Sequence, residues 1–124
     1  MKYIHYFFFI FILISASCNK DETDNTEDIC ICGVDNALED LEWLKNLKNS
    51  ITNCSCQVSI LEGIYNENMV YYVLMNDPLC NSYFNTALIN CNGEVVKTYE
   101  GSEDLDAFAN EVEPIRSIYI CSDK

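Results

Sequence analysis

Histidine is almost absent from this sequence, in which His5 is the only example. His5 lies in an apolar N-terminal run that we expect to be removed as a signal peptide, so the mature chain would contain no histidine. Serine and cysteine nucleophiles in their usual forms depend on a histidine base, and many zinc sites use histidine ligands. The sequence therefore argues against these classes of enzyme, and we predict no catalytic residue, no metal ligand and no cofactor.

Positive charge is also scarce, because the chain has 7 Lys and Arg against 20 Asp and Glu. Removal of residues 1–17 would take Lys2 away and leave 6 basic and 20 acidic residues, a formal charge of −14. Such a surface repels nucleic acid and anionic lipid head groups. We expect no nucleic-acid partner. A basic protein or divalent cations would suit the charge, but a soluble, self-repelling surface is the simpler interpretation.

No apolar run is long enough for a permanent membrane span. The longest, residues 3–14 (YIHYFFFIFILI), stops short of the roughly 20 residues that cross a hydrocarbon core. Lys2 precedes it and Ser15, Ala16 and Ser17 follow it, which is the three-part pattern of a secretory signal. We predict a signal peptide over residues 1–17.

The segment Ser15-Ala16-Ser17-Cys18 resembles the lipobox of bacterial lipoproteins, although Ser15 stands where most lipoboxes have Leu. Residues 18–22 (CNKDE) are similar to the surface-export signal of Bacteroidetes-type lipoproteins, a lysine followed by acidic residues. The resemblance implies that Cys18 is lipidated and holds the protein at the bacterial outer membrane, with export to the cell surface. Two or more acyl chains anchor a protein stably. The alternative is an ordinary signal peptide whose Cys18 joins a disulfide.

Seven further cysteines indicate a disulfide framework, which small exported domains often need. An odd number leaves one thiol free or bonded to another molecule, and the sequence does not fix the pairing. The two Cys-x-Cys motifs are an alternative zinc site, but they lack the usual two-residue gap and an oxidising compartment favours disulfides. The seven are Cys30, Cys32, Cys54, Cys56, Cys80, Cys91 and Cys121.

Residues 19–28 (NKDETDNTED) contain no large apolar side chain. Such a segment cannot bury enough surface to offset its ordering entropy. We therefore expect residues 18–35 to form the lipidated cysteine and a flexible acidic tether. A calcium-binding EF-hand loop would need a central Gly and a terminal Glu at fixed positions, which this segment does not place.

The first periodic segment predicts an amphipathic helix over residues 37–51, with Asn36 as its cap and Glu39 completing a capping box. Trp43 lies at the edge of the apolar face, where packing is the more ordinary role and a binding anchor the alternative. The apolar stripe consists of Ala37, Leu41, Leu44, Leu47 and Ile51.

Beyond Cys56 the hydrophobic period changes to two. Residues 57–65 and 69–75 predict a hairpin around residues 66–68. A second hairpin is predicted from residues 86–91 and 94–99, joined by a type I′ turn at Asn92-Gly93.

A short helix over residues 103–111 is predicted next, capped by Ser102 and ended by Pro114, with a final strand over residues 115–121. Its inward side chains would be Leu105, Phe108, Ala109 and Val112. The fold class is therefore α+β: an amphipathic helix, a four- to five-stranded antiparallel sheet and a short second helix, stapled by disulfides. We expect one domain over residues 36–124, with both helices on one face of the sheet.

Three short motifs carry a resemblance over roughly residues 36–100. They are residues 40–45 (DLEWLK), residues 70–73 (VYYV) and the turn Cys91-Asn92-Gly93. Together they resemble small Bacteroidetes-type lipoproteins, a family without an established activity. The resemblance implies a fold and a location, and no reaction.

A non-catalytic binding or inhibitor-like module, with a protein or small-ligand partner, is the favoured function. Its candidate surfaces are the loop over residues 77–85, with Tyr83 and Phe84, and four strand tyrosines for which packing is the more ordinary role. A structural envelope subunit is the alternative, since the odd cysteine could link it to a partner. An enzyme comes third, with Glu62 and Glu67 as the best carboxylates. The tyrosines are Tyr65, Tyr71, Tyr72 and Tyr99.

Overall fold

A computed structural model describes residues 32–80 and 83–123 of the chain. The expected signal peptide, Cys18, Cys30 and most of the tether lie outside the described residues. Within the described part, no helix is long and apolar enough to cross a membrane.

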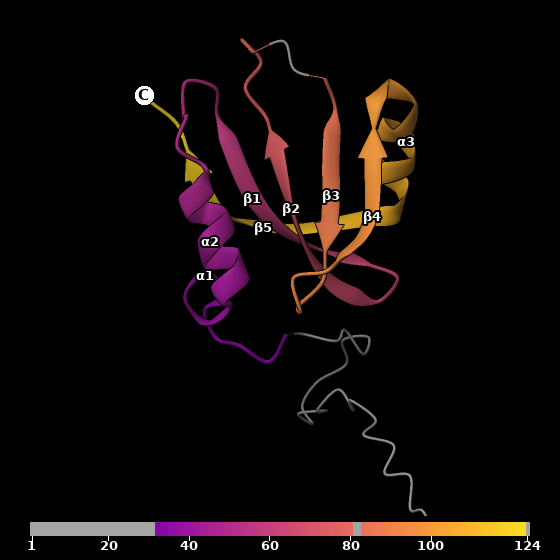
Figure 1. The fold of residues 1–124 in the computed structure, drawn as a ribbon. Helices are drawn as coiled ribbons and strands as arrows, with labels where there is room; N and C mark the ends of the chain where they lie inside the picture. Colours follow the sequence, from indigo (N-terminus) through magenta and orange to yellow (C-terminus); the bar gives the residue numbers. More distant parts are fainter. Residues whose placement is uncertain (1–31, 81–82, 124) are drawn as a thin grey trace, which may run out of the picture.

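The described chain forms three helices and one antiparallel sheet (Figure 1). Strands β1 to β4 follow one another across the sheet, and α3 then returns the chain to the opposite edge, giving the order β4-β3-β2-β1-β5. This confirms the predicted α+β class with five strands. The elements are α1 (Ala37–Asp40), α2 (Glu42–Ser50), β1 (Val58–Tyr65), β2 (Asn68–Met75), β3 (Asn85–Ile89), β4 (Val95–Glu100), α3 (Gly101–Glu111) and β5 (Val112–Cys121).

The predicted first helix is two helices. Leu41 adopts an extended conformation (φ −94°, ψ 102°) between α1 and α2. Asn36 makes no side-chain cap, and its backbone N–H instead donates to Asp40 Oδ2 at 3.0 Å, so the predicted capping box with Glu39 is wrong. No glycine or proline marks the break, and this is why the hydrophobic pattern alone predicts one continuous helix.

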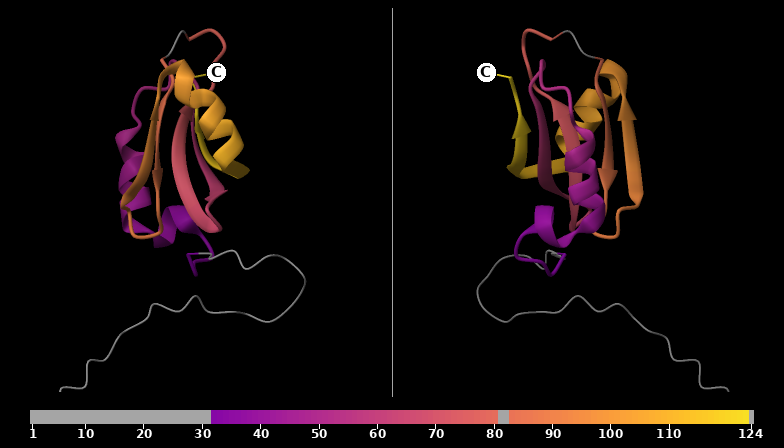
Figure 2. Two further views of the ribbon diagram at one scale, coloured as in Figure 1. Left: turned by 90° about the vertical axis from the view of Figure 1, so that its right-hand side faces the viewer. Right: turned by 60° about the vertical axis from the view of Figure 1, so that its left-hand side comes forward.

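The helices cover opposite faces of the sheet, so the expectation that they share one face is wrong (Figure 2). On one face, Tyr71 of β2 packs in a cluster with Leu44 of α2. On the other, Val70 and Tyr72 pack with Phe108 of α3. The physical reason is that β2 carries bulky residues at consecutive positions, as a strand does when both of its faces are buried.

The first hairpin turns at Asn66 and Glu67, which both have positive φ (48° and 64°), as a two-residue type I′ turn requires. At the second hairpin only Gly93 has a positive φ (83°), so the predicted type I′ turn is wrong. Its backbone N–H donates to Asn90 O at 3.0 Å, closing a type I turn followed by a left-handed glycine. The Asn90 side chain favours this form by accepting from the backbone N–H groups of Asn92 and Glu94.

Helix α3 begins at Gly101, directly after β4 and earlier than predicted. Ser102 lies inside its first turn and does not cap it, while Asp104 Oδ2 accepts from the backbone N–H of Glu100 at 2.8 Å. Of the predicted inward residues, Leu105 is 46% exposed, so Phe108 provides the main inward contact.

Strand β5 begins at Val112 and includes Pro114, which was predicted to lie before the strand. Proline is tolerated there because β5 is an edge strand.

Three disulfides join elements that are distant in sequence. They link Cys32 to Cys91, Cys54 to Cys121, and Cys56 to Cys80. The structure thus confirms the disulfide framework for six of the seven predicted cysteines, and leaves no free cysteine in residues 32–80 and 83–123. Those six thiols are therefore not available to zinc. Cys32, which the sequence assigned to the tether, is bonded to the β3–β4 turn through Cys91.

Candidate functional site

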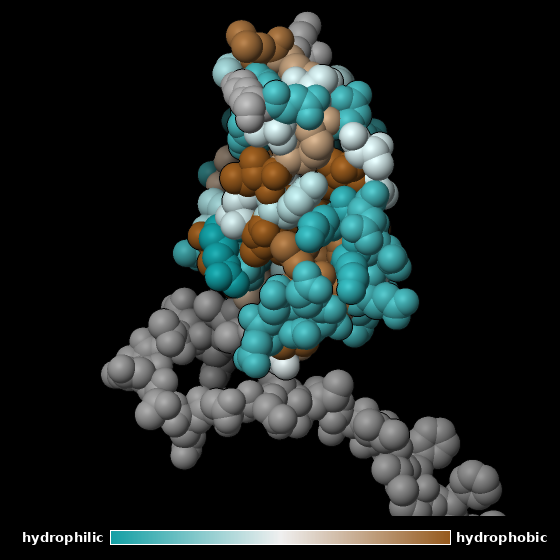
Figure 3. Space-filling model, turned by 90° about the vertical axis from the view of Figure 1, so that its left-hand side faces the viewer, coloured by the Kyte–Doolittle hydropathy of each residue, from teal (hydrophilic) through white to brown (hydrophobic). Residues whose placement is uncertain are grey.

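Exposed apolar side chains gather at one end of the domain. Met75, Leu79 and Tyr83 are 45%, 86% and 73% exposed, and we call these three residues the apolar end. The connection between β2 and β3 lies at the end of the sheet opposite the point where the described chain begins, at Cys32 (Figure 1). Figure 3 shows hydrophobic side chains at this tip, while hydrophilic side chains cover the α1–α2 side. The apolar end therefore lies at the end of the sheet opposite Cys32.

Leu79 is held in a fixed turn. Asp77, only 8% exposed, accepts from the backbone N–H of Gln57 through Oδ2 at 3.2 Å and from that of Leu79 through Oδ1 at 2.9 Å. The backbone N–H of Cys80 donates to Asp77 O at 3.1 Å, and Cys80 is bonded to Cys56. A loop fixed in this way loses little conformational entropy when a partner binds.

The structure separates the two aromatic residues predicted for this loop. Tyr83 is exposed, with its hydroxyl against Gly101, where an added Cβ would lie 2.8 Å from Oη. Phe84 is half-buried, and its ring packs edge-on against Phe108 at 5.5 Å. Only Tyr83 can therefore contribute to a surface.

Most of the predicted tyrosines belong to the core. Tyr71, Tyr72 and Tyr99 are 1% to 2% exposed, and Tyr65 is half-buried. Burial raises the pKa of the Tyr71 and Tyr72 hydroxyls. These four tyrosines therefore pack in or against the core, and they do not form a binding surface.

Trp43 also packs rather than projecting as an anchor. Its ring meets Tyr71 edge-on at 5.7 Å, and its Nε1 donates to Cys91 O at 3.0 Å. A Cβ at Gly93 would approach Trp43 Cγ to 2.9 Å, so the indole and the left-handed turn fit each other.

The two candidate carboxylates do not meet. Glu62 is 5% exposed on β1, and its Oε1 accepts from Arg116 Nε at 2.6 Å. Glu67 lies exposed in the β1–β2 turn. Glu62 and Arg116 border an open hollow of about 330 Å³, whose other lining residues are Asp35, Asn36, Ala37, Leu38, Ser117 and Ile118. This arrangement satisfies a buried charge and provides no acid–base pair.

The sequence did not predict a cluster of Lys97, Tyr99 and Glu111. Glu111 Oε2 accepts from Tyr99 Oη at 2.7 Å and also binds Lys97 Nζ. The Lys97 ammonium lies over the rings of Tyr99 and Tyr65, at 4.7 and 5.7 Å from their centroids. Burial, followed by the bond to Glu111, raises the pKa of Tyr99 to about 12, while the bond from Lys97 lowers the pKa of Glu111. Lys97 and Tyr99 are two residues apart on β4, so the sequence could have predicted that they share a face. Glu111 lies at the end of α3, and no spacing in the sequence places it beside them.

The Tyr99 hydroxyl should ionise near pH 12, because burial and the bond to Glu111 raise its pKa. Its folded pKa exceeds the unfolded value of about 10, so the associated stability is complete below pH 10 and is lost as the pH rises to 12. Phenolate absorbance after a rapid pH jump, before disulfides exchange, measures this step. Tyr99→Phe should remove it, and an unchanged titration in that variant would contradict the assignment.

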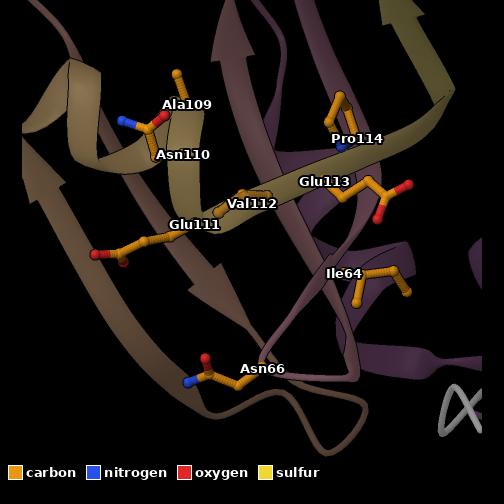
Figure 4. A pocket seen from close by; sticks show the side chains of 8 residues that line it. All are labelled: Ile64, Asn66, Ala109, Asn110, Glu111, Val112, Glu113 and Pro114. Carbon is orange, nitrogen blue, oxygen red and sulfur yellow. The ribbon is translucent and has the colours of Figure 1, made fainter.

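Glu111 also borders the larger hollow, of about 410 Å³, between the end of α3 and the β1–β2 turn (Figure 4). Figure 4 shows Glu111 and Glu113 extending to opposite sides of the chain. The hollow therefore does not gather a pair of carboxylates. Its other lining residues are Ile64, Asn66, Ala109, Asn110, Val112 and Pro114.

The free edge of β5 is a poorer candidate. Ile115 and Ile120 are exposed there, at 48% and 56%. However, the pairing with β1 shifts register twice and Pro114 lacks a backbone N–H, and both features discourage addition of another strand.

Among residues 32–80 and 83–123, no three His, Cys, Asp or Glu side chains are grouped to hold a metal ion. Comparisons with protein-family models, curated proteins and solved structures find no match for this chain. The site geometry alone must therefore support any functional conclusion.

Proposed function

We propose that the protein is a lipid-anchored binding module of the bacterial outer membrane, exposed at the cell surface and acting without catalysis. One observation carries the proposal: the apolar end lies opposite the point where the chain from Cys18 enters the domain. The 14 Cα–Cα steps from Cys18 to Cys32 can span at most about 50 Å. The lipid would hold Cys32 towards the membrane and leave Leu79 and Tyr83 facing outward.

The framework also suits binding better than a covalent structural role. The described cysteines are all bonded within the chain, so a disulfide to a partner would have to come from Cys18 or Cys30. The exposed apolar end is what a reversible protein interface needs, since Leu79 offers a large side chain on a fixed turn.

The test combines the anchor with the apolar end. Palmitate labelling of cells should mark the wild-type protein and should be lost in Cys18→Ser. Cross-linking on intact cells should capture the same partner reproducibly with wild-type protein and with Leu105→Ser, a matched change of an exposed leucine on α3. The double variant Leu79→Ser/Tyr83→Ser should lose that partner while remaining labelled and folded.

Two outcomes would overturn the proposal. Unchanged palmitate labelling of Cys18→Ser would remove the anchor. A partner that stays attached to Leu79→Ser/Tyr83→Ser, and that separates only with reductant in electrophoresis, would instead indicate the structural envelope subunit.

A further inference from the structure

In the part of the chain that the structure describes, no helix covers β3 and β4 on one face of the sheet, and from this face we infer a second binding surface. This surface binds a cationic amphipathic helix of a partner protein. It is distinct from the apolar end, and the inference goes beyond the proposed function by stating the chemistry of the partner. We call it the open face, and its apolar residues are Ala87, Ile89, Val95 and Val96 on β3 and β4.

The strand register identifies which residues share this face. Tyr71 faces α2, and it pairs with Ile89, which in turn pairs with Val95. Residues paired across strands point to the same side of a sheet, so Ile89 and Val95 lie on the α2 face. The register shifts by one residue between Leu88 and Ile89, so Val96 also lies opposite Ile89. Val96 precedes Lys97, which faces α3, and so points to the α2 face. Ala87 is two residues before Ile89 on β3, so Ala87 and its partner Thr98 lie on the same face. Figure 1 shows α1 and α2 beside β1 and β2, with no helix over β3 and β4 on that face.

The apolar side chains on the open face are accessible. Val95 and Val96 are 61% and 46% exposed, and Ala87 and Ile89 are only partly buried. None of the four belongs to either core cluster. Adjacent exposed apolar side chains in a soluble domain mark an interaction surface.

Charge complementarity identifies the partner as basic. Glu94 and Glu100 stand exposed at the two ends of β4. Lys97, the basic residue of β4, pairs in register with Leu88 and so faces α3 instead. The other described basic side chains are engaged elsewhere, with Lys45 near Glu39, Lys48 over Tyr119, and Arg116 on Glu62. With a mature charge of −14, a second copy would be repelled, whereas a cationic segment would be attracted.

The available width fits one helix. Neighbouring strands lie about 4.8 Å apart, so β3 and β4 together offer about 10 Å, which is the diameter of a helix. Trp43 of α2 lies at the end of this face that carries the β3–β4 turn, where its Nε1 donates to Cys91 O and its ring lies against Gly93. A partner helix can therefore lie beside α2 with its apolar side on Ile89 and Val96 and its basic side chains near Glu94 and Glu100.

The test uses the mature lipidated protein in nanodiscs of zwitterionic lipid, with empty nanodiscs as the blank. The probe is an amphipathic leucine–lysine peptide of about 18 residues that carries a photo-crosslinking side chain. We expect binding that weakens with added salt, and cross-links that map to residues 85–100. A scrambled peptide of the same composition should bind poorly because its apolar side chains do not share a face.

A matched pair of variants locates the site. Val96→Lys should weaken peptide binding by about tenfold or more, because it adds positive charge to the apolar floor. Leu105→Lys, which changes an equally exposed residue on α3, should leave binding within about twofold.

The inference is overturned if the peptide does not bind, if cross-links map elsewhere, or if the two variants weaken binding equally. It is also overturned if sedimentation shows a dimer that Val96→Lys dissociates, since a second copy would then occupy the face. The cross-link map uses wild-type protein, so it tests the location of the site even if one of the variants fails to fold. Loss of the partner in Leu79→Ser/Tyr83→Ser tests the apolar end separately.

Discussion

Replacing both Cys32 and Cys91 by serine should lower the free energy of unfolding by about 4 kcal/mol. The disulfide closes a sequence separation of 59 residues, and a bond over so long a loop removes much entropy from the unfolded chain. The change also removes the Cys32 sulfur that accepts from Tyr71 Oη at 3.6 Å. Chemical denaturation, monitored by circular dichroism under non-reducing conditions, measures the loss.

The matched comparison is Cys56→Ser/Cys80→Ser, whose bond spans only 24 residues. The shorter loop predicts a smaller loss, about 3.5 kcal/mol. A loss below about 1 kcal/mol in the Cys32 and Cys91 variant would show that residues before α1 add little to the folded domain.

Leu44→Ala should destabilise the domain by about 3 kcal/mol, within the usual range of roughly 2–5 kcal/mol for buried leucines. Leu44 is fully buried between α2 and the sheet, so truncation removes apolar contacts and leaves a cavity. The midpoint of chemical denaturation should fall while its slope stays the same, because the folded shape is retained.

Leu79→Ala is the control for that prediction, because Leu79 is 86% exposed and fills no cavity. Its effect on stability should stay within about 0.5 kcal/mol. If the two leucine variants were equally stable, the contact of α2 with the sheet would not be a packed core.

The strands were predictable because each shows its own local pattern. Residues 58–65 and 68–75 are rich in β-branched and aromatic side chains on either side of Asn66 and Glu67, so the first hairpin follows from sequence. The local pattern of residues 101–111 does not show which face of the sheet α3 covers. The consecutive bulky residues of β2 do indicate that both faces of the sheet are buried. The break at Leu41 has no local signal in the sequence, and the structure packs Leu41 against the cluster that contains Leu44.

The candidate sites also divide into those with a local sequence pattern and those that join distant parts of the chain. The loop over residues 77–85 was predicted as a surface from Tyr83, Phe84 and its turn residues, and of the two aromatic residues only Tyr83 is exposed. The Lys97–Tyr99–Glu111 cluster and the Glu62–Arg116 pair join residues from different elements, so no spacing in the sequence predicts them. The disulfide partners belong to this second class, because seven cysteines allow many pairings.

The bond between Cys32 and Cys91 also determines how the domain would carry mechanical load. Force applied through a tether at Cys32 passes directly through the disulfide to Cys91, and then along the 11 residues back to Cys80 beside Leu79. That path contains β3 and bypasses α1, α2, β1 and β2. A partner pulling on Leu79 would therefore load covalent bonds and β3, and would leave α1, α2, β1 and β2 unloaded.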